Sequence, residues 1–152
     1  MDEKTKNKKI YEEFLRIGLL YEGITENKFA VIFPLIRDAA FMRITLDELS
    51  ATINKTGAVE EYKNGAEQYG MKQSAALQSY NNLMKVYSST LKNLFTYLPL
   101  SKEHSLSVQE KWRRERMDPE ELEEVLAEER EAAEKSSAEW LARLKAAYGK
   151  VK

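Results

Sequence analysis

The chain has 152 residues, 43% hydrophobic and 32% charged, which suits one domain with a packed core and a strongly charged surface. Its net charge of −1 favours neither nucleic acid nor a membrane as a partner, and the absence of cysteine excludes disulfides and thiolate metal sites. Because no stretch reaches the roughly 20 apolar residues of a membrane span and no apolar signal core follows the first residues, we expect an intracellular protein without a membrane partner.

Residues 1–24 are predicted to form a basic arm followed by a short helix. Apolar residues spaced by 4, 3 and 4 positions between Ile10 and Tyr21 give one stripe of a helix, which Gly23 is expected to end. The arm before it is either a solvated terminus or a contact to DNA phosphates, because clustered lysines displace counterions from DNA. Its lysines are Lys4, Lys6, Lys8 and Lys9.

Residues 25–100 are predicted to form an antiparallel helical hairpin. Two apolar seams with alternating spacings of 3 and 4 run from Ile32 to Ile53 and from Leu77 to Leu98, and each spans 21 residue steps, or roughly 32 Å of helix. Two equal seams of this kind predict two helices that pack along each other. The second seam contains the residues that we assign to helix pairing or to contacts between subunits: Leu77, Tyr80, Met84, Tyr87, Leu91 and Leu94.

The first helix of this hairpin carries a second apolar stripe, from Phe29 to Ile44, so its first half should be buried from two sides. Thr25 is a plausible N-cap. Pro34 predicts a kink near residues 30–33, or else a helix that begins only at Pro34. Residues 54–57 should end the helix.

The connection between the two helices is long for a helical hairpin. Residues 59–62 and 66–69 flank Lys63-Asn64-Gly65, so a short β-hairpin at the tip is possible. Ser74 stands where the N-cap of the second helix is expected.

Residues 101–117 are predicted to be a linker with a basic patch, and residues 118–152 a charged helical tail. His104 has no cysteine, aspartate or second histidine placed to complete a metal site. Asp118-Pro119 is typical of a helix start, and glutamates follow it. After Ser136-Ser137, one helical face carries Trp140, Leu141 and Leu144, which is either a solvated helix lying on the domain or the docking face for a partner protein.

Motifs for catalysis are absent from the sequence. There is no phosphate-binding glycine loop, and one histidine without cysteine or a nucleophile elbow cannot supply a nucleophile with its base. We therefore expect a binding protein, not an enzyme, and no cofactor.

Residues 55–100 resemble the small subunit of phage terminases. The resemblance lies in Glu61-Tyr62-x-Asn64-Gly65-x-x-Gln68-x-Gly70-x-Lys72-x-Ser74, in Tyr80-Asn81-x-x-Met84-Lys85-x-Tyr87 and in Leu98-Pro99. The sequence departs from the family at Ala75, where proline is expected. Residues 10–54 match only by the order of helices, and the tail hardly at all.

The resemblance implies a non-catalytic, oligomeric protein, often a ring, that acts in the cytoplasm of an infected host cell. Its implied partners are double-stranded viral DNA, the terminase large subunit and further copies of itself. The residues that we assign to DNA are Lys4, Lys6, Lys8, Lys9, Lys63, Lys72, Arg113 and Arg114, and the Trp140 face is the candidate contact to the large subunit. The alternative is a helical adaptor that binds only proteins.

Overall fold

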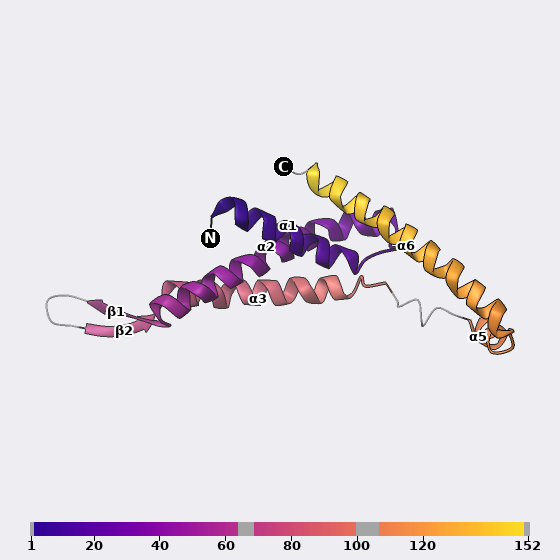
Figure 1. Ribbon diagram of the computed structural model, residues 1–152. Helices are drawn as coiled ribbons and strands as arrows, with labels where there is room; N and C mark the ends of the chain where they lie inside the picture. Colours follow the sequence, from indigo (N-terminus) through magenta and orange to yellow (C-terminus); the bar gives the residue numbers. More distant parts are fainter. Residues whose placement is uncertain (1, 64–68, 100–106, 151–152) are drawn as a thin grey trace.

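The computed structural model describes residues 2–63, 69–99 and 107–150 and is mostly helical, with one small sheet (Figure 1). The predicted all-α class is thereby confirmed in its broad form. The elements are α1 (Glu3–Leu19), α2 (Glu26–Thr56), β1 (Val59–Lys63), β2 (Tyr69–Gln73), α3 (Ala75–Phe95), α5 (Val108–Arg114) and α6 (Pro119–Gly149).

Helix α1 begins much earlier than the sequence analysis predicted. Asp2 caps it, because its carboxylate accepts a hydrogen bond from the Thr5 amide at 2.7 Å. The lysines of the expected arm therefore lie on the first turns of α1, and each projects from a set side of the helix. The helix ends at Leu19 rather than at Gly23, which lies in the following turn with a φ of +85°.

Helix α2 runs from Glu26 through Pro34 without interruption. The alternative in which the helix begins at Pro34 is therefore wrong, whereas Thr25 is the N-cap residue as predicted, although its side chain makes no capping hydrogen bond. Gly57 ends the helix with a φ of +90°, and its amide donates to the Ile53 carbonyl at 2.8 Å.

Strands β1 and β2 form an antiparallel pair in which Val59 lies opposite Gln73 and Lys63 opposite Tyr69. The second strand lies later in the chain than the predicted 66–69. The predicted turn, with Asn64, Gly65 and Gln68, lies outside the described residues. Directly after β2, Ser74 caps α3 by accepting from the Leu77 amide at 3.2 Å, as predicted.

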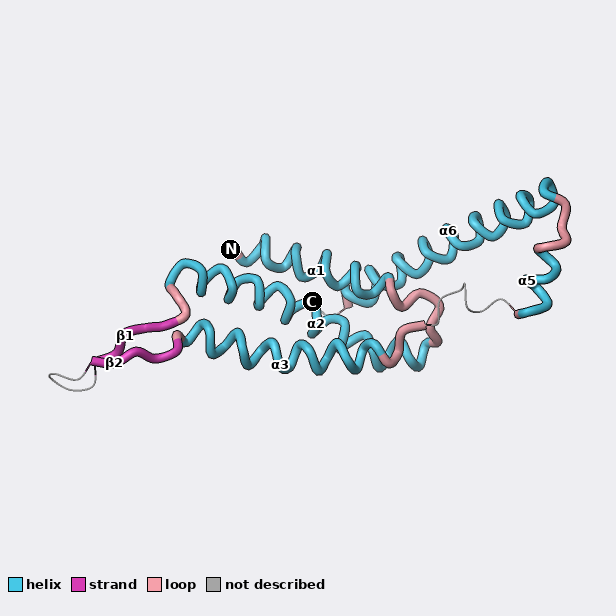
Figure 2. The backbone as a smooth tube through the Cα atoms, turned by 90° about the horizontal axis from the view of Figure 1, so that it is seen from below, coloured by secondary structure: helices cyan, strands magenta, loops and turns pink. Residues whose placement is uncertain are grey.

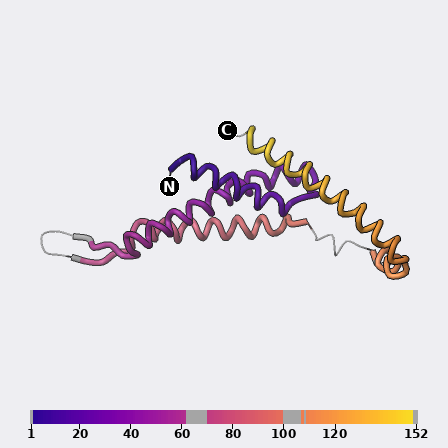
Figure 3. Tube along the Cα trace, viewed as in Figure 1, coloured from indigo at the N-terminus to yellow at the C-terminus, as the bar shows by residue number. Residues whose placement is uncertain are grey.

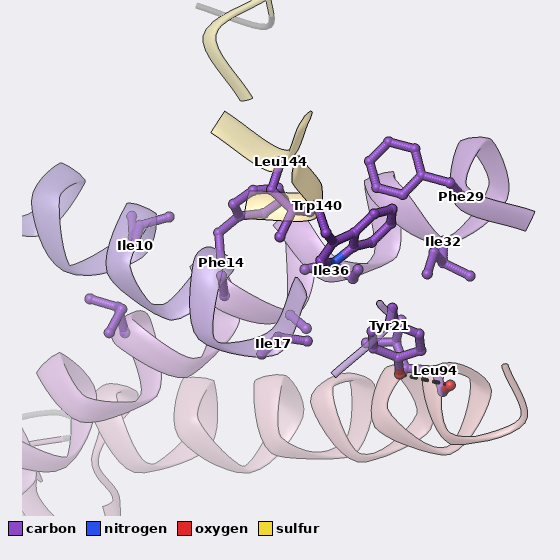
Figure 4. Close-up of a cluster of buried hydrophobic side chains, with 13 residues drawn as sticks. Ile10, Phe14, Ile17, Tyr21, Phe29, Ile32, Ile36, Leu94, Trp140 and Leu144 are labelled. Atoms are coloured by element: carbon purple, nitrogen blue, oxygen red, sulfur yellow. Dashed lines mark hydrogen bonds between the residues drawn. The ribbon is translucent and has the colours of Figure 1, made fainter. Parts of the chain in front are cut away.

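Helix α2 is the centre of the fold. It packs against α1 on one side and α3 on the other, and Figure 2 shows the three helices lying side by side with the β-hairpin beyond one end. Tyr21 ties the turn after α1 to the third helix, because its hydroxyl donates to the Leu94 carbonyl at 2.8 Å (Figure 4). The buried core comprises Ile10, Phe14, Ile17, Tyr21, Phe29, Ile32, Ile36, Ala39, Ala40, Ile44, Leu94, Trp140 and Leu144.

Helix α6 is continuous across Ser136-Ser137, where the sequence changes character. Asp118 caps it by accepting from the Glu120 amide at 3.1 Å, with Pro119 in the first turn, as predicted. Its first half and α5 extend away from the other helices, at the end opposite the β-hairpin, and its last half crosses α1 (Figure 3). His104 lies outside the described residues.

Candidate nucleic-acid interface

The last half of α6 is held on the domain by two buried side chains. Trp140 packs edge-on against Phe29, with ring centroids 5.1 Å apart, and its indole nitrogen donates to the Gly18 carbonyl at 2.9 Å. Leu144 is fully buried (Figure 4), and Gly18 lies beside it. A Cβ atom at position 18 would lie 2.9 Å from both methyl carbons of Leu144, so glycine permits the close approach of the two helices.

Polar contacts flank this apolar contact. The Ser137 hydroxyl donates to Glu22 at 2.6 Å, and the Arg143 guanidinium lies 2.6 Å from Glu26. The same guanidinium lies over the rings of Phe29 and Trp140, at 4.6 and 5.2 Å from their centroids. The polar contacts select one placement of α6 along α1.

This placement creates an open groove of about 890 Å³ between the first turns of α1 and the last turns of α6. Its floor is aromatic, because Tyr148 packs against Tyr11 and Phe14 with ring centroids 4.9 Å apart in each pair. The lining residues are Glu3, Lys4, Asn7, Lys8 and Tyr11 from α1, and Lys145, Tyr148 and Gly149 from α6.

The groove brings together three lysines from the two ends of the chain. Lys4, Lys8 and Lys145 are all exposed, against the one acidic lining residue Glu3. Lys8 also lies 3.8 Å from Glu12, but both side chains are largely exposed, and such a pair contributes little. The groove therefore offers ammonium groups from two walls to an anion that lies between them.

The eight residues assigned to DNA are divided among four places in the fold. Lys4 and Lys8 line the groove, whereas Lys6 pairs with Glu48 at 2.5 Å and Lys9 lies beside Asp47 and Glu48 on the side of α2. These acidic neighbours make Lys6 and Lys9 less suited to phosphate.

The remaining four lie at opposite ends of the molecule. Lys63 ends β1, Lys72 is exposed on β2, and both lie on the hairpin beyond the ends of α2 and α3 (Figure 1). Arg113 is exposed on α5, and Arg114 forms an ion pair with Glu129 of α6. The structure does not bring them to the groove.

The six residues assigned to pairing belong to α3, which packs on α2. Leu94 is buried and Leu91 is 39% exposed, and the other four are half-buried. Burial raises the pKa of the Tyr87 hydroxyl, with the nearby Glu13 adding to the effect. Tyr87 and Leu94 of this seam therefore pack within one chain, whereas Val86 and Phe95 of the same helix are 56% and 73% exposed.

Of the two alternatives for Trp140, Leu141 and Leu144, the structure agrees with the helix that lies on the domain, and the role in binding a partner stays a prediction. Trp140 and Leu144 are buried against α1 and α2 of the same chain, and Leu141 is half-buried. The reason is that α1 and α2 alone would leave the core exposed to solvent at Gly18 and Phe29. Helix α6 covers this part of the core. A partner can reach this face only if α6 leaves the domain.

Sequence reasoning missed Lys145 and the two tyrosines of the groove, since nothing local connects position 145 with position 4. Gly18 was the available signal, because a glycine within a helix often marks a close approach of another element.

Two classes of site find no support in the part of the chain that the structure describes. No group of three or more His, Cys, Asp or Glu side chains could hold a metal ion. Within the same residues, none of the helices has the length and apolar character needed to cross a bilayer. The groove between α1 and α6 is accordingly the candidate site with the clearest chemistry.

Comparisons with models of protein families, with curated proteins and with solved structures gave no match to this chain.

Proposed function

We propose that the protein is a non-catalytic DNA-binding and assembly subunit of a phage genome-packaging terminase, which binds double-stranded DNA and regulates the large, catalytic subunit. The observation that carries the DNA-binding part is the open groove where Lys4 and Lys8 of α1 meet Lys145 of α6. The assignment to a terminase rests on the resemblance of residues 55–100.

The groove suits the phosphate backbone better than base edges. Lysine ammonium groups act as point charges that neutralise phosphates and release counterions, and they carry little sequence information. The described lining offers one amide side chain, Asn7, for more directional contacts. Binding by this groove should therefore be strongly salt-dependent and weakly sequence-dependent.

Assembly into a homo-oligomer is the second part of the proposal. It is supported by α3, which exposes Leu91 and Phe95 one helical turn apart on one face although it belongs to the packed hairpin. Apolar side chains exposed on one helix are typical of surfaces that bury against another chain. Repetition of one such contact around an axis closes a ring.

The test is binding of labelled DNA duplexes by fluorescence anisotropy, combined with light scattering to measure the mass of the complex. We expect salt-sensitive binding to duplexes of any sequence by an oligomer. A triple variant, Lys4→Ala/Lys8→Ala/Lys145→Ala, should bind all duplexes more weakly. The matched control, Lys28→Ala/Lys55→Ala/Lys135→Ala, changes the charge equally at exposed positions outside the groove and should bind as the unmodified chain does.

The second candidate is a helical adaptor that binds only proteins, and the exposed side chains of α3 favour it equally. A chain that leaves every duplex unbound at low salt, while associating through α3, would support the adaptor and contradict the terminase subunit. Phe95→Asp separates the contact surfaces, because it should disrupt association without touching the groove.

A further inference from the structure

The two walls of the groove come from opposite ends of the chain. Lys4 and Lys8 belong to α1, and Lys145 belongs to α6, so neither wall alone presents the three lysines together. We infer that nucleic acid in this groove and α6 docked on α1 stabilise each other, so that the docking of α6 regulates the phosphate site. This inference rests on the proposed function, since it takes DNA as the ligand.

The docked half of α6 is held by a small set of contacts, which includes Tyr148 packed on Tyr11 and Phe14. Of the described residues of α6, only Trp140 and Leu144 are buried, and both meet the domain near Gly18. The flanking contacts, from Ser137 to Glu22 and from Arg143 to Glu26, are polar and partly exposed. The contacts of α2 with α1 and with α3 do not pass through α6, so the inference takes α6 to leave while these contacts remain.

When no anion is present, docking raises the net charge of the lining from +1 to +2, because Lys145 joins Lys4, Lys8 and Glu3. Docking brings the Lys145 ammonium group to the groove that Lys4 and Lys8 already line, and like charges repel. When phosphates lie between the two walls, each wall's lysines are attracted to the phosphates. Without DNA, the apolar contact at Trp140 and Leu144 favours the docked form and the charges of the lysines do not. With DNA bound, both the apolar contact and the lysines favour the docked form.

Thermodynamic linkage gives the size of the effect. A ligand that binds only the docked form lowers the population of the undocked form by a factor of 1 + [L]/Kd, which is about 100-fold at a DNA concentration 100 times Kd. The same linkage requires that any change which undocks α6 weakens DNA binding, in inverse proportion to the docked fraction.

The first experiment follows hydrogen exchange of the α6 amides around residues 140–148 in the full chain, with and without a DNA duplex. We expect exchange in this segment to slow by up to about 100-fold at 100 times Kd, whereas amides of α3 around residues 77–84, on the other side of α2 from α1 and outside the groove, should change little. Bound DNA that leaves exchange in α6 unchanged would overturn the inference and leave the proposed function standing. A chain that binds no DNA would overturn both.

The second experiment tests the reverse direction with Gly18→Leu, which alters no charge. Its side chain would occupy the space of the Leu144 methyl groups, so α6 should undock, which exchange in residues 140–148 reports directly. If one chain in about ten stays docked, the apparent Kd for DNA should rise about tenfold. DNA affinity equal to that of the unmodified chain, with α6 shown to be undocked, would contradict the inference.

A locked variant covers the case in which Gly18→Leu fails to fold. Glu22→Cys/Ser137→Cys places the only two cysteines of the chain where the present side chains make a hydrogen bond, and a short bis-maleimide can join them. The cross-linked chain should bind DNA at least as tightly as the unmodified chain. Cross-linking should also remove most of the effect of DNA on exchange in α6, and an effect that persisted in full would contradict the inference.

Discussion

Helices α2 and α6 have the same length, 31 residues, but they are used in opposite ways. Helix α2 buries eight residues, from Phe29 to Leu46, and has neighbours on two sides. Helix α6 buries two, Trp140 and Leu144, and its first half extends away from the domain with α5. The difference indicates that α2 organises the core along most of its length, whereas α6 contributes only Trp140 and Leu144 to it. That α6 can undock without unfolding the rest is the expectation that the following variants test.

The largest effect is expected in α2. Ile36 is fully buried at the centre of the core, so Ile36→Ala should lower the free energy of unfolding by about 2–5 kcal/mol. Urea denaturation followed by circular dichroism measures this. Leu126→Ala, on the projecting half of α6, is the comparison and should cost about 1 kcal/mol or less, because that side chain is only half-buried. Similar costs for the two variants would contradict the contrast between the helices.

A smaller effect on the free energy of unfolding is expected when Gly18 and Gly149 are each replaced by alanine. Alanine in a helix is ordinarily favoured over glycine by about 1 kcal/mol, but at Gly18 it would meet the Leu144 methyl groups at 2.9 Å. Gly18→Ala should therefore be net destabilising by about 1 kcal/mol and should speed exchange in α6. Gly149→Ala, where a Cβ meets nothing within 4 Å, should be neutral or slightly stabilising. Thermal melting of the pair, with opposite signs, is the check.

Trp140→Phe sharpens the comparison at the docking contact itself. The substitution keeps an aromatic ring but removes the indole donor to the Gly18 carbonyl, which still accepts from the Tyr21 amide at 3.1 Å. Because the carbonyl is not left unpaired, the cost should be about 1 kcal/mol. Hydrogen exchange in residues 140–148 should become faster. The urea concentration at the midpoint of unfolding of the whole domain should change little. An equal loss in both regions would show that α6 unfolds with the core.

The smallest effect concerns pH. Burial raises the pKa of the Tyr21 hydroxyl above its usual value of 10.0, and this hydroxyl donates to the Leu94 carbonyl. A group whose pKa is raised by folding supports the folded state below the unfolded pKa, and this support is lost as the pH rises towards the folded pKa. Stability should therefore fall above about pH 10, and Tyr21→Phe should be less stable at neutral pH but lose less on raising the pH. Denaturation at pH 7 and above pH 10 measures both slopes.

Local features of the fold were predictable from the sequence, and long-range placements were not. Ser74 and Asp118 were identified as helix caps because a cap depends on the next few residues only. The early start of α1 does not follow from local sequence, because a cluster of lysines after Asp2 is equally compatible with a polar arm and with exposed positions of a helix.

The candidate site was only half predictable. Lys4 and Lys8 were assigned to phosphate contacts from their charge, but charge alone could not separate them from Lys6, which Glu48 neutralises across 42 positions of sequence. Lys145 was missed because its placement depends on where α6 docks. Helix α6 docks where Gly18 leaves room for Leu144. The position of that room depends on how the whole core packs, so it cannot be predicted from local sequence.

The salt dependence of DNA binding tests the central claim most directly, namely that Lys4, Lys8 and Lys145 form one phosphate-binding groove. The logarithm of the binding constant should fall linearly with the logarithm of the salt concentration, with a slope of about −0.9 for each phosphate neutralised. Replacing all three lysines with alanine should therefore make the slope about 2.7 units shallower, whereas Lys28→Ala/Lys55→Ala/Lys135→Ala should leave it unchanged. Equal slopes for the groove variant and the unmodified chain would contradict the claim.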